Sequence, residues 1–427
     1  MTGHRPLDSV SYAEARDLAV AAARPLAAER VSLLAALGRV LAEDVMAERD
    51  DPAGPKSAMD GFALAAAQTQ GAAPGAPAAL AFRETVGAGH LARGRVEAGQ
   101  AVRVMTGALL PPGADAVVKQ EDTRPAGAGR FTVERPLAPG ENVIPPGARM
   151  AAGARLLAAG TVVDDQALGV LAGLGRAAVA VHRRPRVALL ALGDELVEPG
   201  QSLAPGQIYV SNLYALEALA ARYGADTLRL GIARDDPAHI EALLRPCIKA
   251  APDAEGCDLI LTLGGSHKGD FDFAQAVQER LGARVLFSRV RINQGPSTRC
   301  AQAGTALLFG LPGTPGVSWC AFELLVRPAL WGLAGRAQLE HPRLRARLTR
   351  ALAFRTASHK AGRPGWDHFH PGRLRLDDDG SPEVAPVLGP HPGELPAAIQ
   401  ADCLIQAPTG VTALAEGDWV RVLWLLG

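Results

Sequence analysis

The chain has 427 residues, of which 48% are hydrophobic, and its 44 basic residues (Lys and Arg) balance 44 acidic ones. A chain of this length is too long to fold around one ordinary hydrophobic core, so we expect two to four domains. A net charge of zero excludes the overall positive field that attracts nucleic acid or an acidic membrane, and we expect neither as a partner. No apolar run approaches the about 20 residues that span a bilayer, and residues 1–10 lack the apolar segment of a secretory signal, so we expect a cytoplasmic protein.

The first predicted element is a helix. Residues 11–42 have apolar side chains at helical spacing and few helix breakers, with Ser11 as a candidate N-cap and Glu14 as an acidic residue in the first turn. From residue 45 to 150, Gly and Pro separate short apolar runs, which predicts a small β-rich module. Within it, the low-complexity residues 65–80 are expected to form a surface loop.

Residues 186–335 alternate strand-like and helical segments. This alternation predicts a mainly parallel sheet with helices on both faces. The strands are predicted at 186–192, 227–232, 258–265, 283–292 and 305–313, and the helices at 212–224, 237–250, 272–282 and 316–333. Residues 340–427 alternate apolar and polar side chains between turns, which predicts a small all-β domain.

The five cysteines are scattered along the chain and form no CxxC pair. This pattern favours reduced structural thiols over a disulfide framework or a zinc site. They are Cys247, Cys257, Cys300, Cys320 and Cys403.

Four of the predicted α/β strands end in loops that carry glycine, proline or acidic residues. Ligands of open α/β sheets bind outside the carboxyl ends of the strands. Glycine lets backbone N–H groups approach an anion there, and a following helix adds the positive end of its dipole. The loop residues are Gly193, Asp194 and Glu195; Asp235 and Asp236; Gly264, Gly265, Lys268, Asp270 and Asp272; and Gly310, Pro312, Gly313 and Pro315.

The loop after residue 263 has the most informative composition. Lys268 and the glycine N–H groups suit an anion, and Asp270 or Asp272 suits a divalent cation, because Mg²⁺ takes carboxylate oxygens together with phosphate and water. Any one such loop, taken alone, is better explained as a turn or a solvated helix start. Four of them at the ends of one sheet predict a phosphate and metal site.

The segment KSAMDGFAL (residues 56–64) lies in the β-rich module. Ser57, Asp60 and Gly61 form a compact polar stretch between apolar residues. The residues alone favour a tight turn in which the Asp side chain accepts hydrogen bonds from backbone N–H groups. Residues 103–122 predict a strand, a turn and a second strand.

Six segments in chain order resemble those of the molybdopterin molybdenumtransferase family, which includes MoeA and the gephyrin E domain. SAMDGFA resembles SAMDGYA, RVMTGALLPPGADAVVKQED resembles RIMTGAPVPEGADAVVMQE, and ALGDEL resembles STGDEL. GQIYVSN resembles GQIYDSN, GLPGTP resembles GLPGNP, and GGSHKGDFDF corresponds to GGVSVGDYDY. The order and spacing agree from about residue 10 onward, so the chain is identified as a member of this family.

The resemblance implies a multidomain α/β fold. An elongated N-terminal domain (1–45 and 150–182) carries an inserted β-rich module (46–149), followed by a three-layer α/β/α molybdopterin-binding domain (183–336) and a small C-terminal β-barrel (340–427). It also implies a homodimer whose active site faces the SAMDG module of the other subunit. The implied reaction inserts molybdate into adenylylated molybdopterin with Mg²⁺ and releases AMP. The implied partners are the molybdopterin-adenylating protein and a client molybdoenzyme or its chaperone.

The resemblance also implies site residues. Catalytic roles fall to Asp60, Glu195 and Asp272, and metal binding to Asp270 and Asp272. Asp60 and Thr106 would come from the partner subunit. The expected substrate-binding residues are Ser57, Thr106, Asp194, Asp235, Asp236, Gly264, Gly265, Lys268, Pro312 and Pro315.

Several positions depart from the family pattern. Asn293 and Pro296 occupy positions that are lysine in the family, Thr314 replaces an asparagine and Leu192 a threonine; of an arginine-rich segment only Arg149 remains. Lys268, Arg291 and Arg299 are candidates to replace the missing cations, although cations at different positions are not geometrically equivalent. The lost cations leave an alternative open: a non-catalytic carrier of molybdopterin or its cofactor, or a maturation factor for one molybdoenzyme.

Overall fold

The computed structural model describes residues 9–249, 251, 254–265, 273–353, 366–387, 400–407 and 409–425. The chain divides into two compact units. The larger contains residues 1–43, 159–169 and 176–427, and the smaller contains residues 44–158 and 170–175.

The larger unit is built on a six-stranded sheet in the order β16-β13-β17-β20-β19-β18. β16, β13, β17 and β20 run parallel to one another, whereas β19 runs antiparallel to both of its neighbours, β20 and β18. The strands are β13 (Arg186–Leu192), β16 (Asp226–Ala233), β17 (Leu259–Leu263), β18 (Arg284–Phe287), β19 (Arg299–Ala303) and β20 (Ala306–Leu311). β19 was not predicted, because its sequence RCAQA lacks an apolar run; it forms by pairing with β20 across a tight turn at Gly304.

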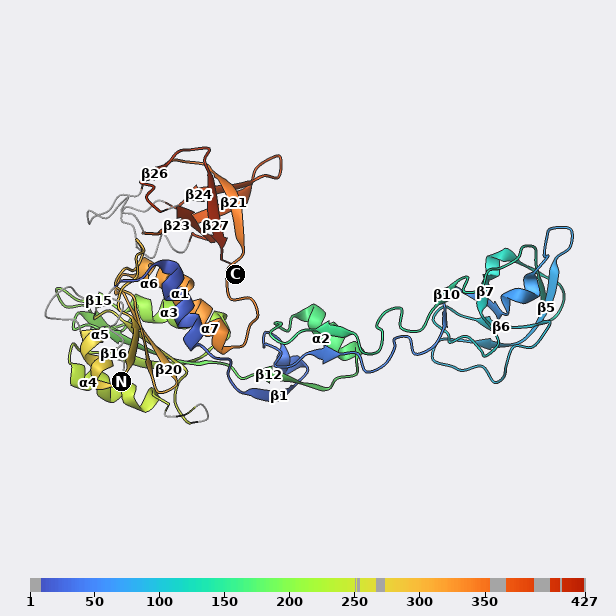
Figure 1. Ribbon diagram of the computed structural model, residues 1–427, viewed down its shortest axis with the longest axis horizontal. Helices are drawn as coiled ribbons and strands as arrows, with labels where there is room; N and C mark the ends of the chain where they lie inside the picture. Colours follow the sequence, from blue (N-terminus) through green and yellow to red (C-terminus); the bar gives the residue numbers. More distant parts are fainter. Residues whose placement is uncertain are drawn as a thin grey trace. The chain divides into compact units, whose positions relative to one another are not determined.

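Helices cover both faces of this sheet, as predicted (Figure 1). In β13, Leu189 packs into the core shared with α1, α3, α6 and α7, and Leu190 packs into the core shared with α4 and α5. Both faces are apolar because a strand covered on two sides has no polar face. The helices are α3 (Ser211–Arg222), α4 (Pro237–Leu244), α5 (Phe273–Arg280), α6 (Pro315–Ala321) and α7 (Arg327–Leu333), with a π-helical turn at Phe322–Val326 between the last two. The three-layer α/β/α prediction is confirmed.

Helix α1 (Tyr12–Ala22) begins as predicted and ends early. Glu14 N donates to Ser11 Oγ (3.2 Å), and Ser11 N donates to Glu14 Oε2 (2.8 Å), which completes a capping box. The expectation of helical structure up to residue 42 was wrong. Pro25 lacks the N–H that a helix interior needs, and β1 (Ala28–Ser32) instead pairs with β12 (Ala178–His182).

The smaller unit contains a second six-stranded sheet, in the order β7-β4-β6-β5-β9-β8. Its core includes Phe62 and Phe131, whose stacked rings have centroids 4.0 Å apart. The predicted loop at 65–80 is exposed at 73–77, but Thr69 is buried in a short 3₁₀ helix. The strands are β4 (Gly61–Leu64), β5 (Ala78–Val86), β6 (Gln100–Val104), β7 (Ala116–Lys119), β8 (Thr123–Pro125) and β9 (Arg130–Val133).

Short paired strands complete the N-terminal half of the chain. β2 pairs with β11, β3 with β10, and β14 with β15. They are β2 (Val45–Met46), β3 (Lys56–Ser57), β10 (Val143–Ile144), β11 (Arg155–Leu157), β14 (Leu196–Val197) and β15 (Ile208–Tyr209), and helix α2 spans Asp165–Gly173.

The C-terminal strands close into a barrel, as predicted (Figure 1). Their order around the barrel is β21-β24-β23-β25-β27. The strands are β21 (Arg343–Leu348), β23 (His368–Leu376), β24 (Pro382–Pro386), β25 (Cys403–Ala407) and β27 (Trp419–Trp424), with β22 (Leu352–Ala353) paired to β26 (Ala413–Leu414). All five cysteines are buried free thiols, as expected. In the described part of the chain, no helix has the length and apolarity needed to cross a membrane.

Candidate functional site

The strands that precede the predicted site loops end at one edge of the central sheet. β16, β13, β17 and β20 are parallel neighbours, so their carboxyl ends meet at the same edge. Backbone hydrogen bonds join these ends: Gly193 N donates to Ala233 O (3.1 Å), and Gly264 N donates to Leu311 O (3.0 Å). The strand ends at residues 192, 233, 263 and 311 therefore form one continuous edge, where open α/β sheets bind ligands.

Close backbone packing explains two glycines at this edge. Gly264 has φ +96°, and a Cβ atom built on it would lie 2.6 Å from Leu192 O. A Cβ atom on Gly265 (φ +68°) would lie 2.9 Å from Leu192 Cδ1. Only glycine avoids both the steric conflict and the strained φ. These glycines thus have a structural role whether or not their N–H groups also bind an anion.

The acidic residues at the edge fall into two groups. Asp194 and Glu195 are exposed, and the Glu195 carboxylate folds over Gly193, where an added Cβ would lie 2.5 Å from Oε2. Asp236 instead caps helix α4 by accepting a hydrogen bond from Ala238 N (3.0 Å). Asp235 is half-buried beside it. Asp236 therefore has a structural function that accounts for its presence, whereas Asp194 and Glu195 face solvent at the strand ends.

Three predicted residues, Lys268, Asp270 and Asp272, lie outside the described residues. Among the residues that are described, no three His, Cys, Asp or Glu side chains gather into a metal-binding group.

The loop after β20 is held by a polar residue of helix α3 that was not among the predicted site residues. Pro315 is the first residue of α6, after Thr314 at the N-cap position. Asn212, in the first turn of α3, donates from Nδ2 to Gly313 O. Asn212 is 8% exposed, and its Oδ1 has no hydrogen-bond partner within the described parts of the chain. The available signal was the family-like segment GQIYVSN, which ends at this residue.

The segment at the lost lysine positions has a structural function here. Asn293 Nδ2 donates to Phe369 O (2.9 Å), and Phe369 N donates to Asn293 Oδ1 (2.8 Å). The side chain thus pairs with the backbone of β23 and holds the barrel to the α/β domain. A lysine has no acceptor atom and cannot form this pair.

The two described cations proposed as replacements are used differently. Arg291 donates to Ser9 O (2.8 Å) and forms an ion pair with Glu14 (3.5 Å), so it is engaged with the N-terminal segment. Arg299 is 8% exposed and opens β19 opposite Gly310 of β20. Arg299 is therefore the one that lies at the carboxyl edge of the sheet.

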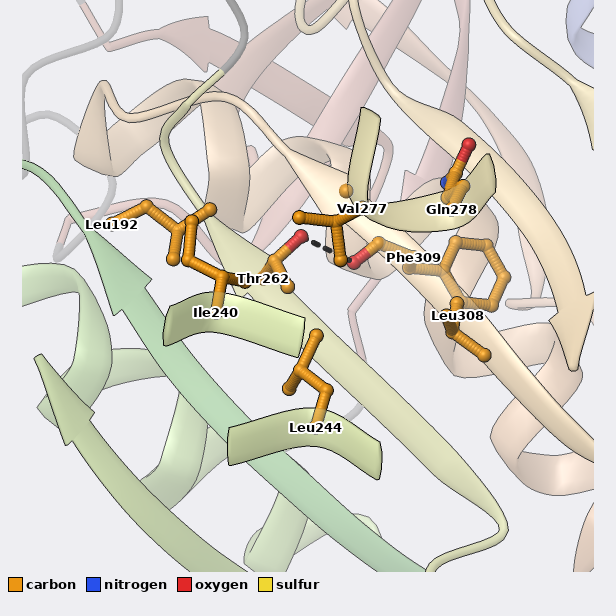
Figure 2. Close-up of a pocket in the computed structure, with 9 residues that line it drawn as sticks. Leu192, Ile240, Leu244, Thr262, Val277, Gln278, Leu308 and Phe309 are labelled. Atoms are coloured by element: carbon orange, nitrogen blue, oxygen red, sulfur yellow. Dashed lines mark hydrogen bonds between the residues drawn. The ribbon is translucent and has the colours of Figure 1, made fainter. Parts of the chain in front are cut away.

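A small cavity under the edge is not the substrate site. Figure 2 shows its lining, which includes Leu192, Ile240 and Thr262, with Thr262 Oγ1 donating to Phe309 O (3.4 Å). Its volume of about 10 Å³ is close to what one water molecule needs.

In the smaller unit, the structure brings the remaining predicted residues together. Asp60 Oδ1 accepts hydrogen bonds from Thr106 N (2.7 Å) and Thr106 Oγ1 (2.8 Å). These bonds hold the pKa of the exposed Asp60 carboxyl below its usual range. Ser57 is buried, and its hydroxyl donates to Met59 O (2.5 Å). The predicted Asp-to-backbone bond exists, but its partner is 46 positions away rather than in the same turn.

Three family models match the chain. They are described as "MoeA N-terminal region (domain I and II)" over residues 10–175, "Probable molybdopterin binding domain" over 188–331, and "MoeA C-terminal region (domain IV)" over 353–425. A molybdopterin molybdenumtransferase of Nostoc sp. is 35% identical over 410 residues, which cover 93% of this chain and 88% of that protein. The chain belongs to the molybdopterin molybdenumtransferase family.

Other members of the molybdopterin molybdenumtransferase family agree. The Bacillus subtilis relative is 38% identical over 305 residues (71% of this chain and 70% of that protein), and a Staphylococcus aureus relative is 32% identical over 397 (92% and 90%). The crystal structure of a molybdopterin biosynthesis MoeA protein from Pyrococcus horikoshii superposes with a TM-score of 0.83 at 28% identity, covering 98% of this chain and 100% of that one.

Proposed function

We propose that the protein inserts molybdate into adenylylated molybdopterin and releases AMP. The observation that carries this proposal is the convergence of four parallel strand ends at one sheet edge, within the region that matches the molybdopterin-binding domain model. The edge combines exposed carboxylates (Asp194 and Glu195) with close-packed glycines and the cation Arg299. Such a site works by positioning its substrates and by fixed electrostatics.

Mg²⁺ fits the donor chemistry of this edge. Asp194 and Asp235 follow adjacent parallel strands and supply carboxylate oxygens, the ligand type that Mg²⁺ prefers. Asp194, with Asp270 and Asp272 from the sequence, would hold the ion. When bound, the ion would offset the negative charge that two anionic substrates bring to an acidic edge.

Asp60 and Thr106 complete the proposed site from the second subunit of a homodimer. The hydrogen bonds from Thr106 keep the Asp60 carboxylate ionised and fix its orientation. Both features suit a group that positions a substrate or its metal ion. The upstream partner would be the protein that adenylylates molybdopterin, and the downstream partner a client molybdoenzyme or its chaperone.

The decisive experiment measures AMP release from adenylylated molybdopterin in the presence of molybdate and Mg²⁺. We expect AMP release by the wild type and a loss of at least tenfold in Asp194→Asn, because removing one preorganised electrostatic contact typically costs about 10²–10³ in rate. Asp226→Asn is the matched control, since this exposed carboxylate opens the same sheet at the amino end of β16. Tight molybdopterin binding without AMP release would instead identify a carrier, and no binding of either molybdopterin species would refute both functions.

A further inference from the structure

A second cavity lies at the amino ends of the central strands, opposite the edge formed by their carboxyl ends. Its volume is about 220 Å³, and Pro185, the residue before β13, lines it. β13 has 7 residues, so the two edges are separated by about 20 Å at 3.3 Å per residue. The cavity is therefore distinct from the site at the carboxyl ends of the strands.

Five arginines line this cavity: Arg39, Arg183, Arg184, Arg222 and Arg336. They come from four separate segments. Arg39 follows the 3₁₀ turn at Leu34–Ala36, Arg183 and Arg184 connect β12 to β13, Arg222 ends α3, and Arg336 follows α7. Arginine side chains repel one another electrostatically. Placing five of them around one cavity is therefore unfavourable unless negative charge offsets the repulsion. The carboxylates around the cavity therefore decide whether it stays positive.

Arg39 and Arg183 each bind a carboxylate. Arg39 pairs with Glu29, and Arg183 binds Asp258 through both terminal nitrogens (2.7 and 2.6 Å). Asp258 also binds Lys249 Nζ (2.8 Å), so this single carboxylate is shared between two cations. Asp258 therefore cannot neutralise both Arg183 and Lys249.

Arg336 is a half-buried cation held by an aromatic ring. Its guanidinium carbon lies 3.7 Å from the centre of the Trp331 ring, and burial lowers the pKa of the guanidinium. Within the described ranges, no carboxylate forms an ion pair with Arg336 or with the exposed Arg184. The stacking fixes the Arg336 plane while leaving its N–H edge available to an acceptor.

The other polar lining groups do not cancel this charge. Tyr223 donates its hydroxyl to both oxygens of Glu323 (2.9 Å each), and Arg327 Nε lies 3.6 Å from that carboxylate. The carboxyl end of α3 presents its partial negative charge near Tyr223, and Arg222 in the last turn opposes it. An anion bound here would thus be held by guanidinium groups rather than by a helix dipole.

We propose that this cavity binds a doubly charged tetrahedral oxyanion, either inorganic phosphate or the phosphate group of a small ester. Guanidinium groups match such oxyanions because two parallel N–H donors meet two oxygens. The volume of about 220 Å³ is many times the roughly 10–15 Å³ that one water needs, so a phosphate fits with an organic substituent. This site goes beyond the proposed reaction and does not depend on it.

The test is calorimetric titration of the full-length protein with inorganic phosphate at constant ionic strength. We expect saturable binding by the wild type and a loss of affinity of roughly tenfold or more in Arg184→Gln, with a larger loss when Arg336→Gln is added. Arg184 is exposed, so its single substitution leaves the packing intact. Arg350→Gln, an exposed arginine of the barrel domain, is the matched control and keeps wild-type affinity.

Further arms separate the possible ligands and roles. Ribose 5-phosphate binding more tightly than phosphate identifies an ester site, and equal binding identifies a free-phosphate site. The proposal is overturned if the wild type does not bind phosphate, or if the double variant binds it as the wild type does. It is also overturned if Arg184→Gln changes the molecular mass in solution while leaving phosphate affinity unchanged, because the arginines then contact another chain.

Discussion

At the scale of single residues, Asp60 combines a structural role with features that suit ligand binding. Its carboxylate accepts two hydrogen bonds from Thr106, yet the side chain remains exposed. A purely structural Asp would need only these bonds. An exposed, oriented and ionised carboxylate also suits contact with a ligand.

Substitution Asp60→Asn separates the two roles. The amide oxygen of Asn still accepts from Thr106, so we expect a folded protein of unchanged molecular mass. If Asp60 contributes to the site, AMP release falls by about 10²-fold, as for loss of one charged contact in an active site. Steady-state AMP release measures this, with Asp122→Asn, an exposed carboxylate of the same module, as control. Wild-type turnover in a folded Asp60→Asn protein would show that Asp60 has only a structural role, through its hydrogen bonds with Thr106.

The lowered pKa of Asp60 also predicts a pH dependence of stability. The folded state binds this proton less tightly than the unfolded state, so the contribution is present above the unfolded pKa of about 3.9 and is lost as pH falls through the folded pKa. Urea unfolding of the wild type and Asp60→Asn should therefore differ most at neutral pH and converge on acidification. A difference that grows toward low pH would contradict this assignment.

At the scale of the element, close strand-end packing distinguishes two glycines with similar backbone angles. Gly264 (φ +96°) faces Leu192 O, whereas Gly231 (φ +89°) has open space around its Cβ position. Alanine at Gly231 introduces φ strain of about 1–3 kcal/mol, and alanine at Gly264 adds a steric conflict to that strain. We expect Gly264→Ala to be the more destabilising in chemical unfolding. Equal losses of stability in the two variants would show that the backbone near Gly264 shifts enough to relieve the steric conflict with Leu192 O.

Asn293 connects two elements that lie far apart in the sequence. Restoring the lysine of the family pattern, Asn293→Lys, removes the donor and the acceptor that pair with Phe369. We expect a loss of about 1–3 kcal/mol, since buried backbone groups lose their partners. Thermal unfolding checks this, with Arg350→Lys as a surface control. A more stable and more active Asn293→Lys protein would show that the missing cation matters more than the pairing.

At the scale of the whole molecule, the proposed composite site requires two chains. A symmetric dimer places the same patch of each subunit against its partner and so builds two equivalent sites. We expect a solution mass of two chains at micromolar protein, measured by sedimentation equilibrium. A mass of one chain would remove the second subunit from the site and with it the proposed role of Asp60.

The sequence by itself determined the alternation of strands and helices, the two apolar faces of the central sheet, the capping box at Ser11 and the loops at the strand ends. These features follow from local chemistry: side-chain periodicity, capping residues, glycine and proline. The helix predicted over residues 11–42 ends at Ala22, because Pro25 interrupts it and because β1 pairs with the distant strand β12. This tertiary pairing outweighs the local helical preference.

Only the tertiary structure decided which distant groups meet. Asp60 finds Thr106 46 positions away, and Asn293 finds Phe369 76 positions away. The arginines of the second cavity come from four separate segments that carry no shared motif. Periodicity describes how a segment presents its faces, whereas contacts between segments depend on strand order, register and packing, which are set by the fold as a whole.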